Sequence, residues 1–184
     1  SHAPRRQQSA RMLIDAFMPE GITQLAVDSI FMMPQLGVLA NIDKEELKDD
    51  ASQAALEVFD NDCLIRLGTC VSPVGKVKPK SKMAQVSLTF KDGSTKEIEI
   101  LEGSLEMLEV PYEEVKINVV PSRGVDVGAG KGEPVDSVIY GGVVGLIFDG
   151  RNRPITLSAD PSERIDSLLN WSSAVDEYPK GDLF

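Results

Sequence analysis

Histidine is almost absent from this sequence: the chain of 184 residues contains one, His2. A Ser-His-Asp triad or a Cys-His pair needs a histidine as its base, and a histidine-rich metal site needs several. The first ten residues, SHAPRRQQSA, are interpreted as a cloning scar or as a cut inside a longer protein. His2 is therefore no candidate base, and we expect neither histidine-based catalysis nor a metal site.

Cysteine is scarce as well, with Cys63 and Cys70 the two present. If both lie on one strand, the seven-residue separation places them roughly 23 Å apart. A disulfide needs Cα atoms within about 7 Å of one another. We expect reduced, buried thiols and a cytoplasmic protein. No segment approaches the roughly 20 apolar residues that span a bilayer, which predicts no contact with a membrane.

Positive charge is also in short supply: 19 lysines and arginines stand against 29 acidic residues, a formal net charge of −10. An acidic chain repels nucleic acid phosphates and anionic membrane surfaces. The basic residues are scattered apart from Arg5-Arg6 and the short run from Lys76 to Lys82. We therefore expect no nucleic acid partner.

Residues 1–60 are predicted to alternate helix, strand, helix and helix. Apolar residues at helical spacing predict a helix over 9–18, with Met12, Leu13, Ala16 and Phe17 on its inner face. ITQLAVD (22–28) is typical of a strand, and Pro34 begins a short helix that ends at Ala40. The acidic stretch 43–46 has the pattern of a helix start.

Residues 61–158 have a different, β-rich pattern. Val86, Leu88 and Phe90 alternate with polar residues before the turn Asp92-Gly93, which predicts a hairpin with the next alternating run. Val115–Val119 alternates again, the apolar run 143–148 predicts a central buried strand, and 155–157 a last strand. Residues 159–184 form a third region, where Asp160-Pro161 begins a C-terminal helix. The predicted class is α+β, a mainly antiparallel barrel or sandwich flanked by N-terminal and C-terminal helices.

The stretch RGVDVGAGKGEPVDS (123–137) is the one that most resembles a phosphate-binding loop. A P-loop needs glycine five places before Gly130 and a hydroxyl after Lys131, but Val125 and Gly132 occupy those positions. The acids Asp126 and Glu133 would also repel a phosphate. We interpret the stretch as a glycine-rich connection between strands, with Gly141 and Gly142 in a similar role.

A family resemblance rests on four elements in this order: LIDAFMPEGITQLAVDSIFMMPQLGVLAN, DCLIRLGTCVSPVG, RGVDVGAGKGEPV and GGVVGLIFDGRNRPI. Together they resemble the C-terminal region of the glutamate mutase accessory L family, which is often called MutL and is distinct from the DNA mismatch-repair protein of that name. The similarity runs from about Met12 to Leu157. The most specific pieces are RGVDVGAGKG and GGVVGLIFDGRNRP.

The resemblance implies a longer parent that begins with an actin/Hsp70-like ATPase region and uses ATP and Mg²⁺. Residues 1–60 would resemble the end of an ATPase lobe, where Gly37 could approach the nucleotide in the parent. The implied role is a chaperone- or reactivase-like accessory to an adenosylcobalamin-dependent glutamate mutase. This chain would be its non-catalytic binding or structural module, with no cofactor of its own and a mutase subunit as partner. The family-motif residues are Arg123, Gly124, Asp126, Gly128, Gly130, Lys131, Gly141, Gly142, Asp149 and Arg151.

Two alternatives stay open at this point. One is an enzyme or small-ligand domain that uses the loop carboxylates Asp126, Glu133 and Asp149 together with Lys131. The other is a lipoyl- or biotin-carrier-like fold, although Met83 follows Lys82 where such a fold needs the reverse order. A homodimer also stays open, because alternating strands leave edges that a second chain could cover.

Overall fold

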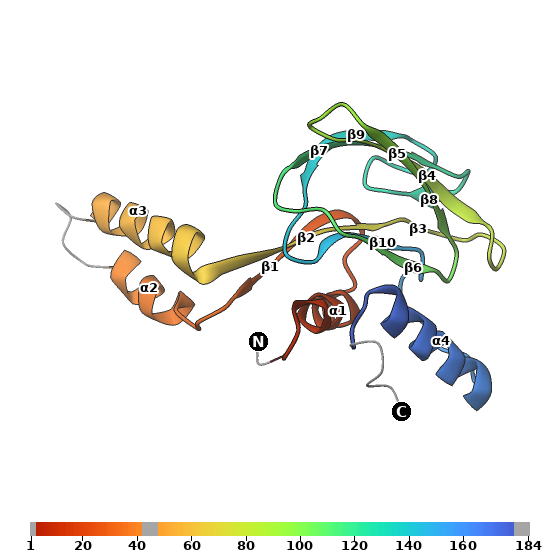
Figure 1. Cartoon of the computed structure of the whole chain (residues 1–184), viewed down its shortest axis with the longest axis horizontal. Coiled ribbons are helices and arrows are strands. Elements are labelled where there is room, and N and C mark those ends of the chain that lie inside the picture. The colour runs from red at the N-terminus through yellow and green to blue at the C-terminus, as the bar shows by residue number, and fades with distance from the viewer. Residues whose placement is uncertain (1–2, 42–47, 179–184) are drawn as a thin grey trace. The chain divides into compact units, whose positions relative to one another are not determined.

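The computed structural model describes residues 3–41 and 48–178, and in these it is an α+β structure with four α-helices and ten strands (Figure 1). None of the helices in these two ranges is both long enough and apolar enough to cross a membrane. In chain order the elements are α1 (Arg6–Phe17), β1 (Gly21–Asp28), α2 (Met33–Ala40), α3 (Lys48–Val58), the π-helix η1 (Phe59–Cys63), β2 (Leu64–Ser72), β3 (Val74–Gly75), β4 (Lys82–Thr89), β5 (Thr95–Leu101), β6 (Leu105–Leu108), β7 (Glu114–Pro121), β8 (Val125–Asp126), β9 (Val135–Tyr140), β10 (Gly145–Asp149) and α4 (Pro161–Ala174).

Contacts divide the chain into two compact units. The smaller one, the helical unit, covers Ala26–Arg66 and holds α2 and α3. The larger one, the β-rich unit, joins Ala3–Leu25 to Leu67–Phe184. The predicted helix start at 43–46 lies outside the described residues.

Three sheets make up the strand pairing: β1-β2-β10-β6, β5-β4-β7-β9, and the short pair β3-β8. The predicted hairpin is confirmed as β4 and β5, which pair antiparallel with Val86 opposite Ile98. The predicted central strand is also confirmed, since β10 lies between β2 and β6 and is buried throughout. β2 and β10 pair in parallel. The pairs β6–β10, β3–β8, β4–β5, β4–β7 and β7–β9 are antiparallel. No closed barrel is found among the described strands.

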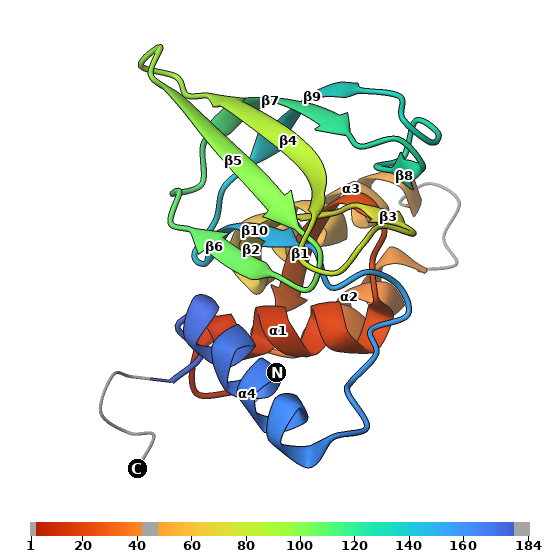
Figure 2. The same cartoon turned by 90° about the vertical axis from the view of Figure 1, so that its right-hand side faces the viewer.

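Within the β-rich unit, the main hydrophobic core lies between the two four-stranded sheets. Leu146 and Phe148 of β10 contribute to it from one sheet, and Leu88, Ile117 and Val119 from the other. Because side chains alternate along a strand, Ile147 faces the opposite side, where α1 and α4 lie (Figure 2). Ile14 of α1 is fully buried.

The predicted inner face of α1 was wrong. Met12 and Phe17 are exposed, whereas Ala10, Ile14 and the charged Arg11 are buried. The reason lies in the tertiary structure: Arg11 pairs with Asp15 one turn later, and Asp15 also lies 2.8 Å from Arg151, which follows β10. A burial pattern derived from apolar spacing alone cannot include a buried arginine.

The strand predicted over 155–157 was also wrong, because these residues follow a turn and pair with no strand. The turn is held in place by Asn152, whose side chain donates to the carbonyl of Gly75 at 2.7 Å and accepts from its amide at 3.1 Å. The predicted start of the C-terminal helix at Asp160-Pro161 is confirmed. Asp160 precedes α4 and its carboxylate accepts from the Glu163 amide at 3.0 Å, a typical N-cap.

Candidate functional site

In the glycine-rich loop between β7 and β9, backbone amides bind a carboxylate that belongs to the same loop. Asp126 ends the short strand β8, and its Oδ1 accepts hydrogen bonds from the amides of Gly128 at 2.7 Å and Gly130 at 3.1 Å. These two bonds, the Gly128 bond foremost, hold the pKa of the Asp126 carboxyl below its usual value. Backbone amides that could have cradled a phosphate are therefore occupied by a carboxylate of the same loop.

The rest of this loop is closed by its own backbone. The Gly132 amide donates to the carbonyl of Val125 at 2.8 Å, and Gly128 and Gly130 adopt φ values of +113° and +114°. Only glycine takes this conformation without strain. Arg123 and Lys131 are exposed, and no ion pair joins Arg123 to Asp126 within the described ranges. The loop builds a turn, as its failed P-loop pattern predicts.

Gly141 and Gly142 mark a place where two backbone segments cross. A Cβ on Gly141 would lie 2.0 Å from the carbonyl oxygen of Pro111. The Gly142 amide donates to the Val110 carbonyl at 2.9 Å. Both glycines are buried, so in this chain they permit close packing and present no surface to a ligand.

Asp149 and Arg151 lie at a turn, where charged side chains usually face solvent, but here both side chains are buried. The side chain of Asp149 is 0% exposed and that of Arg151 is 1% exposed. Arg151 donates from its amide and Nε to Asp149 Oδ1, at 3.0 and 2.9 Å, and from Nη2 to Oδ2 at 2.8 Å. The carboxylate is enclosed because the fork of the guanidinium matches it in a bidentate pair.

Three further charged residues extend this pair into a cluster. Arg153 Nη2 donates to Asp149 Oδ2 at 3.0 Å and to Ser72 Oγ at 2.8 Å. On the other side, Arg151 Nη1 lies 2.8 Å from Asp15 Oδ1 of α1. We call the set Asp15, Asp149, Arg11, Arg151 and Arg153 the buried charge cluster.

The ring of Trp171 in α4 completes this arrangement. The guanidinium carbons of Arg11 and Arg151 lie 5.7 and 5.1 Å from its centre, at the distance of cation–π contacts. The indole Nε1 donates to the Gly103 carbonyl at 2.9 Å. The buried charge cluster thus ties α1, the end of β10 and α4 together.

Electrostatics within the cluster keep Asp149 and Arg151 charged. Burial pushes the pKa of the Asp149 carboxyl upward, but the hydrogen bond and charge of Arg151, with the charge of Arg153, outweigh burial and hold that pKa below its usual value. Burial likewise pushes the Arg151 pKa down, yet Asp149 and Asp15 raise it overall. Because arginines bind both of its carboxylate oxygens, Asp149 has a structural role, and a substrate cannot reach it.

Gly37 has no packing role in the described structure. It lies in the middle of α2 with an ordinary helical φ, and a Cβ added there would meet nothing within 4 Å. The neighbouring side chain of Val38 is 75% exposed. This chain's own fold therefore does not require a glycine at this position.

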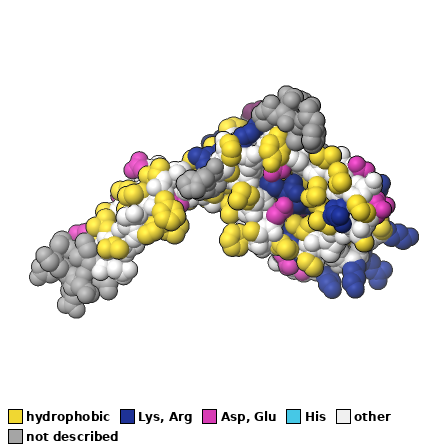
Figure 3. Space-filling model, turned by 90° about the horizontal axis from the view of Figure 1, so that it is seen from below, with side chains coloured by type: hydrophobic (Ala, Val, Ile, Leu, Met, Phe, Trp, Pro, Cys, Tyr) yellow, Lys and Arg dark blue, Asp and Glu magenta, His cyan; other side chains and the backbone are white. Residues whose placement is uncertain are grey.

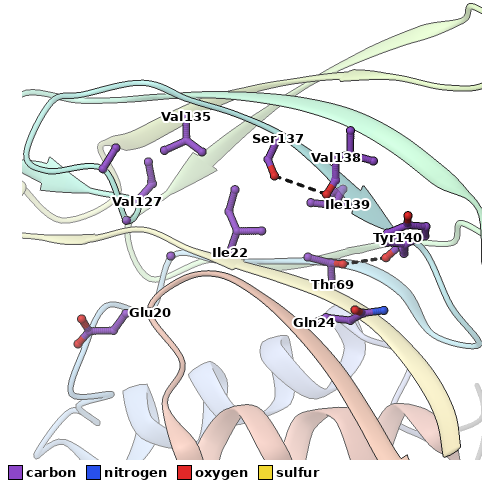
Figure 4. Close-up of a pocket in the computed structure, with 13 residues that line it drawn as sticks. Glu20, Ile22, Gln24, Thr69, Val127, Val135, Ser137, Val138, Ile139 and Tyr140 are labelled. Atoms are coloured by element: carbon purple, nitrogen blue, oxygen red, sulfur yellow. Dashed lines mark hydrogen bonds between the residues drawn. The ribbon is translucent and has the colours of Figure 1, made fainter. Parts of the chain in front are cut away.

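A cavity of about 520 Å³ opens between the edge strands β1 and β9 (Figure 4). Ile22, Val127 and Ile139 form an apolar floor, while Gln24, Thr69 and Ser137 add polar groups. Thr69 Oγ1 donates to the Tyr140 carbonyl at 2.8 Å at one end of it. Its size suits a small ligand, but it carries one acidic residue, Glu20, and no basic one.

The residues of the two alternatives do not converge on this cavity. Asp126, Glu133, Asp149 and Lys131 are not among the residues that line it, although Gly128 and Ala129 of the same loop are. No cluster of three or more metal-ligating side chains occurs in 3–41 and 48–178. Lys82 lies at the start of β4 and pairs with Glu99 at 3.0 Å, so it is not at the tip of a hairpin.

The two cysteines are free and buried, as expected. Burial, followed by the nearby Asp149 charge, raises the pKa of the Cys70 thiol from 9.0 to about 12. A thiol whose folded pKa is raised stabilises the fold fully below its unfolded pKa, and this stabilisation is lost as the pH rises toward the folded value.

We expect Cys70 in a Cys63→Ser background to resist a thiol reagent at pH 8, because the thiolate is the reactive form. Stability should decline between pH 9 and about pH 12. The measurements are reagent uptake, native and in denaturant, and urea unfolding across this range. Cys70→Ala is the control and should lack that part of the alkaline decline. Rapid native labelling would contradict the prediction.

Sequence reasoning singled out Asp149 and Arg151 but not the other three members of the buried charge cluster, Arg11, Asp15 and Arg153, nor Trp171 beside it. Asp15 and Arg153 lie within the elements that carry the family resemblance, but neither was a candidate site residue. The available signal was the i, i+4 pair of opposite charges on α1, on the same side as Ile14. In comparisons with known proteins, no family model, no curated protein and no solved structure matches this chain.

Proposed function

We propose that the chain is a non-catalytic binding and structural module of an ATPase-type accessory protein that serves an adenosylcobalamin-dependent glutamate mutase. The parent would use ATP and Mg²⁺ in another region, and the cobalamin would belong to the client enzyme. One observation carries the proposal: in each of the two motif segments, a carboxylate that could serve a site is bound within the fold. Asp126 is bound by its own loop amides and Asp149 by arginines.

This use of the motifs favours a scaffold over a reaction centre. In the proposed role, the sheets of the β-rich unit act together as an open barrel-like support, and the exposed surface carries the contacts to a protein partner. The free, buried thiols are in keeping with a cytoplasmic location. The acidic composition disfavours nucleic acid as the partner.

A pull-down with the proposed parent tests this role. The tagged parent should recover the mutase, with a dependence on ATP, and a parent that lacks this region should lose the recovery. Retained ATP hydrolysis by the shortened parent is the control that its ATPase region is folded. Undiminished recovery of the mutase by the shortened parent would refute the proposal.

A small-ligand-binding domain is the second candidate, and the cavity between β1 and β9 favours it. Its apolar floor, its neutral polar groups and its lack of a basic residue suit a small uncharged molecule better than a phosphate. A ligand screen by thermal shift separates the two candidates when it is repeated on Ile22→Trp, which fills the cavity. A ligand that stabilises the native chain and not this variant would support the second function.

A further inference from the structure

The helical unit exposes many large apolar side chains for its size. Its own core contains Leu36, Ala55 and Cys63 as fully buried residues. Figure 3 shows apolar side chains gathered over this region of the chain. The large apolar residues exposed here by 39–75% are Ile30, Phe31, Met33, Val38, Leu39, Leu56 and Val58. Clusters of exposed apolar residues on this scale mark surfaces that bind another molecule.

The loop before α2 holds one of these side chains in a strained conformation. Phe31 has φ +61° and is 75% exposed. The left-handed region is unfavourable for a bulky residue. Asp28 holds the loop here: its carboxylate accepts from the amides of Ile30 at 3.2 Å and Met33 at 2.9 Å. The loop thus presents a preorganised aromatic side chain to solvent, which is typical of a binding anchor.

The outer side of α2 adds an independent observation. Met33 and Gly37 are one turn apart, as are Pro34 and Val38, so the four share one side of the helix. All four are exposed. A glycine in a helix interior is unfavourable, and among residues 3–41 and 48–178 no contact explains Gly37. A missing side chain on an apolar helix face allows another helix to approach closely.

The charges of the helical unit select among partners, and one of its carboxylates, Asp28, binds the amides of Ile30 and Met33 in this face. In the described part of the helical unit, six carboxylates outnumber the two basic residues, Lys48 and Arg66. Arg66 is already paired with Asp60. The exposed acids include Asp49, Asp50 and Asp62. Such a surface repels a second copy of itself and attracts basic side chains.

We propose that this face, made by Ile30, Phe31, Met33, Gly37 and Val38, binds an amphipathic helix of another protein whose apolar side is flanked by lysines or arginines. The inference deepens the binding role proposed above and rests on it. Phe31 is the anchor, Gly37 is the point of closest approach, and the carboxylates of the helical unit set the preference for a basic partner. This is recognition of an amphipathic helix by its apolar side, with charge complementarity between the partners.

The test uses two labelled synthetic helices of about five turns with a leucine face, one flanked by lysines and one by glutamates. Fluorescence anisotropy with the full chain should show at least tenfold tighter binding of the lysine helix, with weakening as salt increases. Phe31→Ala and Gly37→Leu should each weaken it at least tenfold. Phe17→Ala, which removes an equally exposed phenylalanine of α1 (77%), should leave binding unchanged.

Gly37→Leu separates binding from folding, because leucine is the better helix former and nothing occupies the space around Gly37. Its melting temperature should match or exceed that of the native chain while binding is lost. Equal binding of the two helices, or full binding by Phe31→Ala and Gly37→Leu, would overturn the proposal. So would a dimer in sedimentation that Phe31→Ala dissociates. If the helices fail to bind but the mutase is still recovered, only this inference falls.

Discussion

Replacing Arg151 with alanine is expected to lower the free energy of unfolding by about 3–5 kcal/mol, the cost of removing one partner from a buried ion pair. Asp149 would keep one arginine, Arg153, and the backbone amide of residue 151, but it would lose the two hydrogen bonds from the guanidinium of Arg151 and with them the bidentate contact. Asp15 and Trp171 would lose the guanidinium between them. Urea unfolding at pH 7 measures the change.

Two controls give this prediction its specificity. Lys82→Ala removes an exposed ion pair with Glu99 and should cost about 1 kcal/mol or less. The second control is pH. In the native chain the lowered pKa of Asp149 contributes stability above the unfolded pKa of about 3.9, and this is lost as the pH falls through the folded value.

In Arg151→Ala the balance at Asp149 should reverse, because burial then dominates and raises its pKa. A raised pKa favours the fold at low pH. The stability deficit of the variant should therefore shrink as the pH is lowered from 7 to about 4. A deficit below about 1 kcal/mol at pH 7, similar to that of Lys82→Ala, would show that the buried charge cluster contributes nothing specific.

The second large effect is expected at Gly68, where β2 meets β10. Gly68 pairs with Gly145 across the parallel strands, and a Cβ on Gly68 would lie 1.8 Å from the Gly145 carbonyl oxygen. Its φ of +138° adds strain for any other residue. The two strands must separate to accept even a methyl group. Gly68→Ala should therefore cost about 4–5 kcal/mol or more, an exceptional loss for one substitution.

Gly103→Ala is the matched control for this prediction. Gly103 also has a positive φ, +80°, but a Cβ there would meet nothing within 4 Å. Its substitution should cost about 1–2 kcal/mol, the backbone strain alone. Thermal and urea unfolding of both variants separate the steric effect from the conformational one. Equal losses at the two positions would mean that the close contact of Gly68 with Gly145 has no energetic role.

Several elements of the fold could be predicted because their signals are local. The Asp92-Gly93 turn between two alternating runs predicts β4 and β5, and the Asp160-Pro161 cap predicts α4. The run 143–148 has the length and composition of a central strand. Each of these signals depends on the preferences of a few neighbouring residues, which tertiary structure did not override.

Other features depend on residues far apart in the chain. The inner side of α1 was mispredicted because Arg11 is buried where Asp15 pairs with it and with Arg151, which comes from the end of β10. The burial of Asp149 and Arg151 could not be predicted for the same reason: the sequence does not show that α1 and Trp171 will enclose them. Isolated charges are solvated, and only a matched partner makes their burial favourable.

The sequence by itself determined what chemistry is ruled out at the glycine-rich loop. With Val125 and Gly132 where a P-loop needs glycine and a hydroxyl, no nucleotide cradle could form there. The tertiary structure decided what the loop's groups do instead, since Asp126 takes the amides of Gly128 and Gly130. It also decided which apolar residues stay outside the core. Periodicity can place Val38 and Gly37 on a helix, but only the packing of α2 on α3 leaves them exposed, because burial depends on what the rest of the chain can cover.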